Sequence, residues 1–560
     1  MGFSLSPSTT VNEVDLTNRI PAVSTTIVGT VGQFLWGPAF EKTQVTNERE
    51  LIDTFNYPND TVADHWHSAA EFLRYGSDLW VVRAVDPTTA LNAGLEITDD
   101  SYGTVSGIAT AYIPNFSNQP TITFGANGKL KIFARNPGAL GNTNIKVAVC
   151  SATDFASADI ISGTSFASEF EYIPQEHATY DYYDQLAIAV LWLDTYNNTW
   201  TIVEKWIVGL DPVEKDNYNK STYIENIINN KSKYLYAYDD TTNLETPNSI
   251  EATFLLGGND GTPAAGNIQV GYDEFDNAEE FDVSIIMDGG NNDAVTGAYI
   301  IDNIADVRKD CVAVLNVPEA DVVGVATIAT AIANCVTYRT TTLNKNSSYA
   351  ELHANWKWAY DKFGEKYRWM PMSGDIAGLM VQSDENTDPW YPAAGLVRGQ
   401  IKNVKKLAIQ PNRTYRDTLY KNGINAIVGF PGQGSVLWGQ KTLLDQPSAF
   451  DRINVRRLFI VLEKAISTMS KYMIFEFNDD TQRELFKLMV NPYLKNIQGR
   501  RGIYEYLVTC DETNNTPTVI DNNEFIGDIY IKPARSAEFV KLNFIAVATG
   551  VNFSEILLRD

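Results

Sequence analysis

Three strand-like runs close this 560-residue chain, and their pattern constrains its fold more than any other feature. The runs 503–510, 525–533 and 537–553 are rich in Ile, Val, Tyr and Phe, and clusters of Asp, Asn, Gly and Pro separate them. The third run is longer than an ordinary strand of roughly 3–10 residues. We therefore expect a small sheet followed by a strand-like segment that extends beyond it.

Two amphipathic helices are expected directly before these runs. Apolar residues recur at i, i+3, i+4 and i+7 over 454–473 and again over 481–497. Thr481, followed three residues later by Glu484, predicts a capping box at the start of the second helix. Helices followed by strands predict a compact α+β unit in which no grouping of residues looks catalytic.

Earlier in the chain, strand and helix signals alternate and predict an α/β domain. A polar, β-rich stretch interrupts that pattern and reads as an insertion, because long insertions are tolerated at surface loops. The predicted fold class is therefore α/β and α+β multidomain, with extended N- and C-terminal arms. The expected parts are an N-terminal arm (1–20), a main α/β domain (21–95 and 256–388), an inserted outer β-rich domain (96–255), a C-terminal inner α+β domain (389–535), and a C-terminal strand and arm (536–560).

The composition excludes several classes of protein. Apolar residues make up 44% and aromatic residues 11% of the chain, which is typical of packed globular units. No apolar run reaches the roughly 18–20 residues of a membrane span. The N-terminus lacks the features of a signal peptide, and the four cysteines are scattered without metal-like spacing. We expect a protein made in a reducing cytoplasm.

Charge is distributed unevenly along the chain. The net charge of −25 disfavours nucleic acid as the main partner. Residues 391–560 hold 22 Lys and Arg against 17 Asp and Glu, whereas the other 390 residues hold 22 against 52. An acidic body joined to a mildly basic end suggests that the two ends face different surroundings.

The few motifs that imitate reactive sites are better explained as structure. Residues 432–442 resemble a phosphate-binding loop, but Gln440 adds one residue before the lysine, and bulky side chains stand where backbone amides would curl around phosphate. His65 and His67 point apart on a helix. The acidic run 273–282 lacks the alternating ligands of a calcium loop. We expect no catalytic residue, no cofactor and no metal.

Several phrases of the chain resemble contractile-tail sheath proteins. The resemblance is patchy over 21–95, recurs at 129–150 and 255–320, and is dense from 389 to 556. The phrases are WGP (36–38), RNPGALGN (135–142), DPWYPAAG (388–395), AFDRINVRRL (449–458), FEFN (475–478), CDETNNT (510–516) and ID (520–521).

The resemblance implies a structural protein that is not an enzyme. Such a subunit polymerises as stacked hexameric rings around a tail tube in a metastable extended state, and it contracts on a baseplate signal to drive the tube through the host envelope. The expected partners are further copies of the chain, the tail tube protein, the baseplate and the tail terminator or neck proteins, with no nucleic acid and no membrane insertion. The expected location is the virion tail, after assembly in the host cytoplasm. The sheath of a bacterial injection or secretion machine is the closest alternative, and an α/β enzyme with an assembly domain is a more distant one.

Strand exchange between neighbouring subunits is expected at the two chain ends. Residues 9–15 have strand composition but no local hairpin partner, and sheath proteins resemble this chain in having such an arm. The expected exchanging residues are Thr9, Val11, Glu13, Val14, Leu542, Phe544, Ile545 and Val547.

A basic face of the last domain is expected to contact the tube. The resemblance assigns that domain to the inner layer of the sheath, where complementary charge gives a weak contact that salt screens. The candidate residues are Arg452, Arg456, Arg457, Arg483, Lys487, Arg500 and Arg501.

Overall fold

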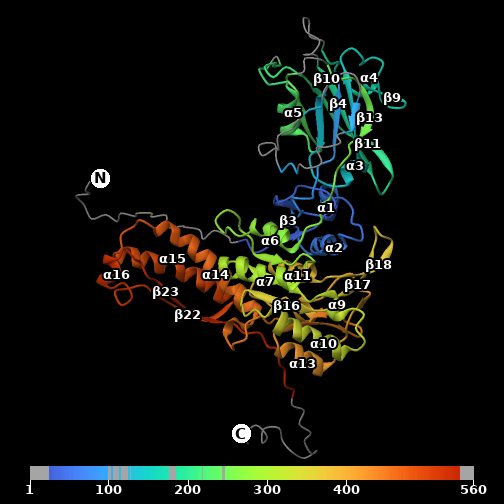
Figure 1. The fold of residues 1–560 in the computed structure, drawn as a ribbon. Coiled ribbons are helices and arrows are strands. Elements are labelled where there is room, and N and C mark those ends of the chain that lie inside the picture. Colours follow the sequence, from blue (N-terminus) through green and yellow to red (C-terminus); the bar gives the residue numbers. More distant parts are fainter. Residues whose placement is uncertain are drawn as a thin grey trace, which may run out of the picture. The chain divides into compact units, whose positions relative to one another are not determined.

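The chain forms two compact units, Met1–Ile474 and Phe475–Asp560. The computed structural model describes residues 24–98, 102–104, 112–114, 124–125, 128–175, 185–216, 218–242 and 246–542, and Figure 1 shows their helices and strands. The first unit contains an α/β domain and a β-rich insertion, and the second is a small α+β unit. The predicted mixed, multidomain α/β fold is confirmed, whereas the predicted arm at 1–20 and most of the predicted strand at 537–553 lie outside the described residues.

An eight-stranded sheet organises the first unit. Its inner strands are parallel, and an antiparallel strand closes each edge. Valine, isoleucine and alanine dominate the parallel strands because helices bury both of their faces. The strand order is β2 (Thr43–Val45), β3 (Leu79–Arg83), β1 (Val28–Gly32), β14 (Ile285–Met287), β15 (Val312–Asn316), β16 (Ala350–Ala354), β20 (Ile424–Phe430) and β21 (Gly434–Leu437).

Each face of this sheet is covered by its own layer of helices. One layer packs Ile268, Ile304, Ile332 and Leu419 onto the sheet. It comprises α6 (Ala265–Asp273), α7 (Ala294–Tyr299), η3 (Ile300–Ala305), α8 (Asp306–Arg308), α9 (Glu319–Val322), α10 (Ile328–Thr337), η4 (Tyr338–Leu343) and α13 (Arg413–Lys421). The opposite face carries α1 (Glu48–Phe55), α2 (Ala63–Phe72), α11 (Ser373–Asn386) and the start of α14 (Ile453–Ser470).

Smaller elements complete this unit. Asn47 caps α1, and its side chain accepts a hydrogen bond from the Glu50 amide at 2.9 Å. The remaining elements are β17 (Lys357–Asp361), β18 (Lys366–Met370) and β19 (Lys406–Leu407) in a three-stranded sheet, and the short helices α12 (Gly395–Arg398), η5 (Ala449–Asp451) and η6 (Lys471–Met473).

The insertion has a hydrophobic core of its own between two four-stranded sheets. One sheet has the order β12 (Leu235–Asp239), β6 (Gly128–Ala134), β4 (Gly94–Thr98) and β5 (Tyr102–Thr104), and the other has the order β11 (Thr199–Val208), β10 (Leu186–Asp194), β7 (Ile145–Ser151) and β13 (Ile250–Phe254). β10 and β11 form an antiparallel hairpin around Asn197 and Asn198. Shorter elements of the insertion are α3 (Leu140–Asn144), β8 (Asp159–Ile161), β9 (Thr164–Ser165), α4 (Phe166–Glu169) and α5 (Ile224–Lys231).

Arg83, at the end of β3, joins the insertion to the α/β domain. Its guanidinium is fully buried and donates hydrogen bonds of 2.9 Å to the carbonyls of Phe34, Gly37 and Pro137. Asp260, whose carboxylate accepts from the Ala139 amide at 2.9 Å, favours the charged guanidinium. The phrases WGP and RNPGALGN therefore meet at one arginine, and their shared role is structural.

One predicted domain boundary is wrong. The sequence places the start of the last domain at residue 389, but β20 and β21 belong to the eight-stranded sheet, and Ile453 and Ile460 of α14 lie in its core. The compact units instead divide after Ile474. The loop at 432–442 contributes the turn and second strand of the β20–β21 hairpin, in which Phe430 pairs with Gly434. Its glycines thus serve a tight turn.

Replacing Arg83 with Met is expected to destabilise the first unit by about 3–5 kcal/mol, because three buried carbonyls lose a charged donor at nearly constant side-chain volume. Denaturant unfolding measures the loss. Arg49→Met is the matched control, since that side chain is 89% exposed and only a surface ion pair with Asp53 is removed. Equal stability of the two variants would contradict a central role for Arg83.

Candidate assembly surface

A two-stranded hairpin is the exposed centre of the second unit. β22 (Ile503–Thr509) pairs antiparallel with β23 (Asp528–Pro533), and Leu507 lies opposite Tyr530. Within the described part of this unit, no third strand joins either strand. Two rows of backbone donors and acceptors are therefore available at its outer edges, and such edges accept further strands.

The two faces of this hairpin differ in character. Tyr506 lies on the face toward α15 (Asp480–Gly499), and its hydroxyl donates to the Asn491 carbonyl at 3.2 Å. The opposite face presents Leu507 and Tyr530, each 59% exposed, beside an ion pair between Lys532 and Glu505. Large apolar side chains placed opposite each other on an exposed sheet face are typical of a surface that a partner covers.

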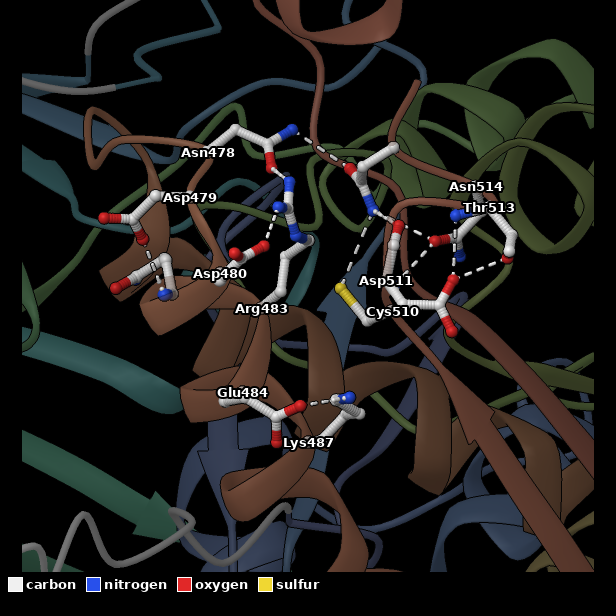
Figure 2. A network of polar contacts seen from close by, with 12 residues as sticks. Asn478, Asp479, Asp480, Arg483, Glu484, Lys487, Cys510, Asp511, Thr513 and Asn514 are labelled. Carbon is white, nitrogen blue, oxygen red and sulfur yellow. Dashed lines mark hydrogen bonds and ion pairs between the residues drawn. The ribbon is translucent and has the colours of Figure 1, made fainter. Parts of the chain in front are cut away.

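A network of amide side chains holds the loop between the two strands in place (Figure 2). The buried Asn515 side chain donates to the Ile526 carbonyl at 2.7 Å and accepts from the Ile526 amide at 2.9 Å. Asn478 donates to the Asn515 carboxamide oxygen at 3.0 Å and to the Glu524 carbonyl at 2.8 Å, which ties this loop to the chain that leads into α15. The loop also contains the short helix α16 (Pro517–Asp521).

The start of α15 differs from its prediction. Asp479 is the N-cap, and its carboxylate accepts from the Gln482 amide at 2.8 Å. The predicted capping box of Thr481 and Glu484 is wrong because both residues already lie inside the helix. Glu484 instead pairs with Lys487 at 2.5 Å, one turn further along.

Three of the predicted tube-facing arginines are not exposed. Arg483 donates to the Asn478 side chain at 2.9 Å and pairs with Asp480, as Figure 2 shows. Arg457 pairs with buried Asp384 at 2.5 Å, and Arg456 lies over the Tyr349 and Phe450 rings. All three residues are at most 7% exposed. The expectation of a continuous exposed basic face is therefore wrong at Arg456, Arg457 and Arg483.

The Arg457–Asp384 pair has the electrostatics of a buried structural contact. Burial raises the pKa of the Asp384 carboxyl, and the neighbouring Arg457 guanidinium opposes that shift. Removing either partner would leave the other charged and buried, which is strongly destabilising. The pair therefore fixes α14 to α11.

The other predicted cationic residues are more accessible. Arg500 and Arg501 are exposed just after α15 ends, and Lys487 is half-buried. Arg452 pairs with Asp451 at 2.7 Å while its side chain remains 24% exposed. Their contact with a tube remains a prediction.

Most of the predicted exchanging residues lie outside the described chain. These are Thr9, Val11, Glu13, Val14, Phe544, Ile545 and Val547. Leu542 is described, is 72% exposed, and belongs to a stretch after β23 that forms no strand up to that residue. Phe539 and Val540 in the same stretch are 80% and 76% exposed.

The described ranges hold neither a metal-ligand cluster nor a membrane-spanning helix. Within these ranges no three His, Cys, Asp or Glu side chains come together as metal ligands would. None of the described helices combines the length and apolar composition needed to cross a bilayer.

Three models of phage tail sheath domains match this chain, and together they cover most of it outside the insertion. The Phage tail sheath C-terminal domain matches residues 445–546, the Phage tail sheath protein central domain matches 273–443, and the Tail sheath protein Gp18 domain III N-terminal region matches 25–84. Two relatives align with the chain over nearly its whole length. The tail sheath proteins of Vibrio phage KVP40 and Enterobacteria phage T4 are each 33% identical to it, and each alignment covers 99% of both chains. The chain belongs to the phage tail sheath protein family. The resemblance predicted from its phrases is confirmed.

Solved structures of sheath proteins share the fold. The crystal structure of the sheath tail protein from Listeria innocua aligns with a TM-score of 0.52 at 12% identity, covering 92% of this chain and 96% of that one. The contracted helical sheath of the anti-feeding prophage aligns with a TM-score of 0.50 at 11% identity, covering 97% and 99%. At these low identities the similarity shows a shared fold and nothing more.

The residues that hold the β22–β23 hairpin together were not predicted from the sequence. Asn478 and Asn515 belong to the phrases FEFN and CDETNNT, which were noted only for their resemblance to sheath proteins. A run of Asp, Thr and Asn directly after a strand is a signal for side-chain-to-backbone turns and could have identified them.

Replacing Asn515 with Ala is expected to destabilise the second unit by about 2–3 kcal/mol, because the Ile526 amide and carbonyl lose their partner in a buried site. Chemical denaturation followed by hydrogen exchange of the β22 amides measures this loss. Asn522→Ala removes the same group from an exposed position and should leave exchange unchanged. Equal protection in both variants would show that the network does not support the hairpin.

Proposed function

We propose that this sheath protein is a structural, non-enzymatic subunit that stacks as hexameric rings around a tail tube. It assembles in a metastable extended state and contracts on a baseplate signal, which drives the tube through the host envelope for genome delivery. The energy is stored in subunit contacts during assembly, so the cycle requires no hydrolytic site. The observation that supports this most directly is the β22–β23 hairpin with two open edges and one exposed apolar face.

Strand exchange at that hairpin is the proposed link between subunits. An incoming strand makes backbone hydrogen bonds along an open edge and buries alternate side chains against the neighbouring strand. The exposed run Phe539–Leu542 that follows β23 has the composition such a segment needs. We propose that the N-terminal arm, including Val11, and the C-terminal segment, including Phe544, occupy edges on neighbouring copies. Subunits joined in this way can rotate during contraction without separating.

The arm leaves the α/β domain from an anchored position. The Ser284 hydroxyl donates to the Ser24 carbonyl at 2.9 Å, and the Arg457–Asp384 pair lies beside Thr25. A tension applied through the arm would therefore reach the sheet and α14 directly. This arrangement suits a chain whose arm links it to a neighbour.

The further partners follow from the same role. They are the tail tube protein, the baseplate and the tail terminator or neck proteins, in a virion tail assembled in the host cytoplasm. The relatives that cover the whole chain are phage proteins, which favours a phage tail over a bacterial injection or secretion machine. We also propose that the insertion at about 96–255 projects outward and is dispensable for polymerisation.

Deleting residues 1–18 is expected to abolish long polymers while the melting curve stays unchanged, because the hairpin would lose an incoming strand but each subunit would keep its core. Electron microscopy and sedimentation measure polymer length. A chain with residues 1–18 replaced by a Gly/Ser segment of equal length is the matched control for arm length and should also fail. Full-length cylinders from either variant would contradict strand exchange by the N-terminal arm.

Reversing Arg500 and Arg501 to Glu is expected to weaken co-sedimentation with tail tubes about tenfold at low salt and less at high salt, since exposed charges affect association more than stability. Lys215→Glu with Lys220→Glu reverses two exposed charges of the insertion and should leave tube binding unchanged. Unaltered binding of the Arg500 and Arg501 variant at every salt concentration would exclude these residues from the tube contact.

A further inference from the structure

Positive charge in the last third of the chain is concentrated before the hairpin unit. Residues 391–474 hold 13 Lys and Arg against four Asp and Glu, whereas 475–560 hold nine against 13. The excess therefore belongs to the α/β unit. The open strand edges belong to the other unit and do not account for this positive charge.

Five cations of that region form a surface that we call the basic patch: Arg413, Arg416, Lys421, Lys441 and Arg452. The first three lie on α13, whose inner side buries Leu419 against the core. The other two contact the Tyr420 ring of the same helix, with Lys441 at 4.9 Å and Arg452 at 5.6 Å from the ring centre.

The surroundings of the basic patch leave it positively charged. Two carboxylates accompany the five cations: Asp417 on α13, and Asp451, which pairs with Arg452. Arg416 lies over the Phe430 ring at 5.8 Å. Ring contacts hold several of these cations in place, and side chains that are already ordered lose less entropy when they bind a partner.

A complementary surface lies at the end of α6. Residues 273–282, which we call the acidic segment, hold six carboxylates and no cation. Lys42 pairs with Glu274 and Glu280 at 3.3 Å, and Lys464 pairs with Asp282. Asp276 and Glu279 are exposed, and the segment retains an excess of negative charge.

The two surfaces lie at opposite ends of one layer of helices. α6 packs against β1 and β3, and α13 packs against β20. Along the sheet, β14, β15 and β16 separate β1 from β20, which is about 19 Å at the usual strand spacing. Figure 1 shows α6, α7, α10 and α13 in succession. A subunit thus carries an acidic end and a basic end on the same face of its sheet.

We propose that the basic patch docks onto the acidic segment of a second copy of this chain. Because the two surfaces differ, the contact is heterologous, and repeated heterologous contacts build rings or open helices. The contact rests on the proposed sheath function and specifies one lateral interface of the polymer that does not use the strand edges. Its charge makes it sensitive to ionic strength.

Charge reversal on each side, alone and together, tests this contact. Arg413→Glu with Lys421→Glu reverses the basic patch, and Asp276→Lys with Glu279→Lys reverses the acidic segment. Each double variant is expected to lower the sedimenting polymer at least tenfold at low salt, with an unchanged melting curve. The chain carrying all four changes should polymerise again, because opposite charges face each other once more. Lys231→Glu with Lys233→Glu is the control for two exposed reversals elsewhere and should behave as wild type.

The outcomes separate this contact from the proposed function. Normal cylinders from both double variants, or no rescue in the fourfold variant, would overturn the contact while leaving a polymerising sheath protein. A second contrary result is a basic-patch variant that forms cylinders without tubes but fails to assemble on tubes. That result would assign the basic patch to tube binding and would overturn the proposed contact between copies. A wild-type chain that never forms cylinders would overturn the proposed function together with the contact.

Discussion

Unpaired backbone groups at strand edges are the constraint on which this sheath protein depends. The eight-stranded sheet ends at both sides in a short antiparallel strand, β2 or β21, and two helical layers bury its faces. Within the described residues the β22–β23 hairpin has no further strand at either edge, and α15 covers only one of its faces. A two-stranded hairpin gains most of its stability from what packs onto it. A finished core and an unfinished hairpin on one chain give a subunit that can fold first and then use its open edges to assemble.

Buried polar groups hold each of the two units together from within. Arg83, at the end of β3, donates to Phe34 of the α/β domain and to Pro137 of the insertion. Asn515, near the start of the loop between β22 and β23, is hydrogen-bonded to Ile526 near its end. Both groups replace the hydrogen bonds that water would supply to buried carbonyls and amides. Several phrases shared with sheath proteins occur at these two junctions, so the resemblance there reflects folding. It does not identify surfaces that contact partners.

Burial also determines which charges are available for contacts between subunits. Arg456, Arg457 and Arg483 are used inside their own units, whereas cations of α13 and carboxylates after α6 remain at the surface. An acidic end and a basic end on one helical layer favour a repeated, directional contact over a closed dimer. Strand exchange and lateral charge contacts would then act on different parts of the subunit, so neighbours could stay joined while their lateral packing changes.

The sequence by itself determined the local elements and the family. Helical spacing predicted α14 and α15, β-branched runs predicted β22 and β23, and the long phrases identified a sheath protein, because these signals depend on neighbours within a few residues. Only the tertiary structure decided that β20 and β21 complete the main sheet, that Asp479 caps α15, and that three arginines of a basic stretch are buried. Spacing along a chain shows which side chains share a face of a helix. Which face is covered depends on residues distant in sequence, such as Asp384 opposite Arg457 and Pro137 opposite Arg83.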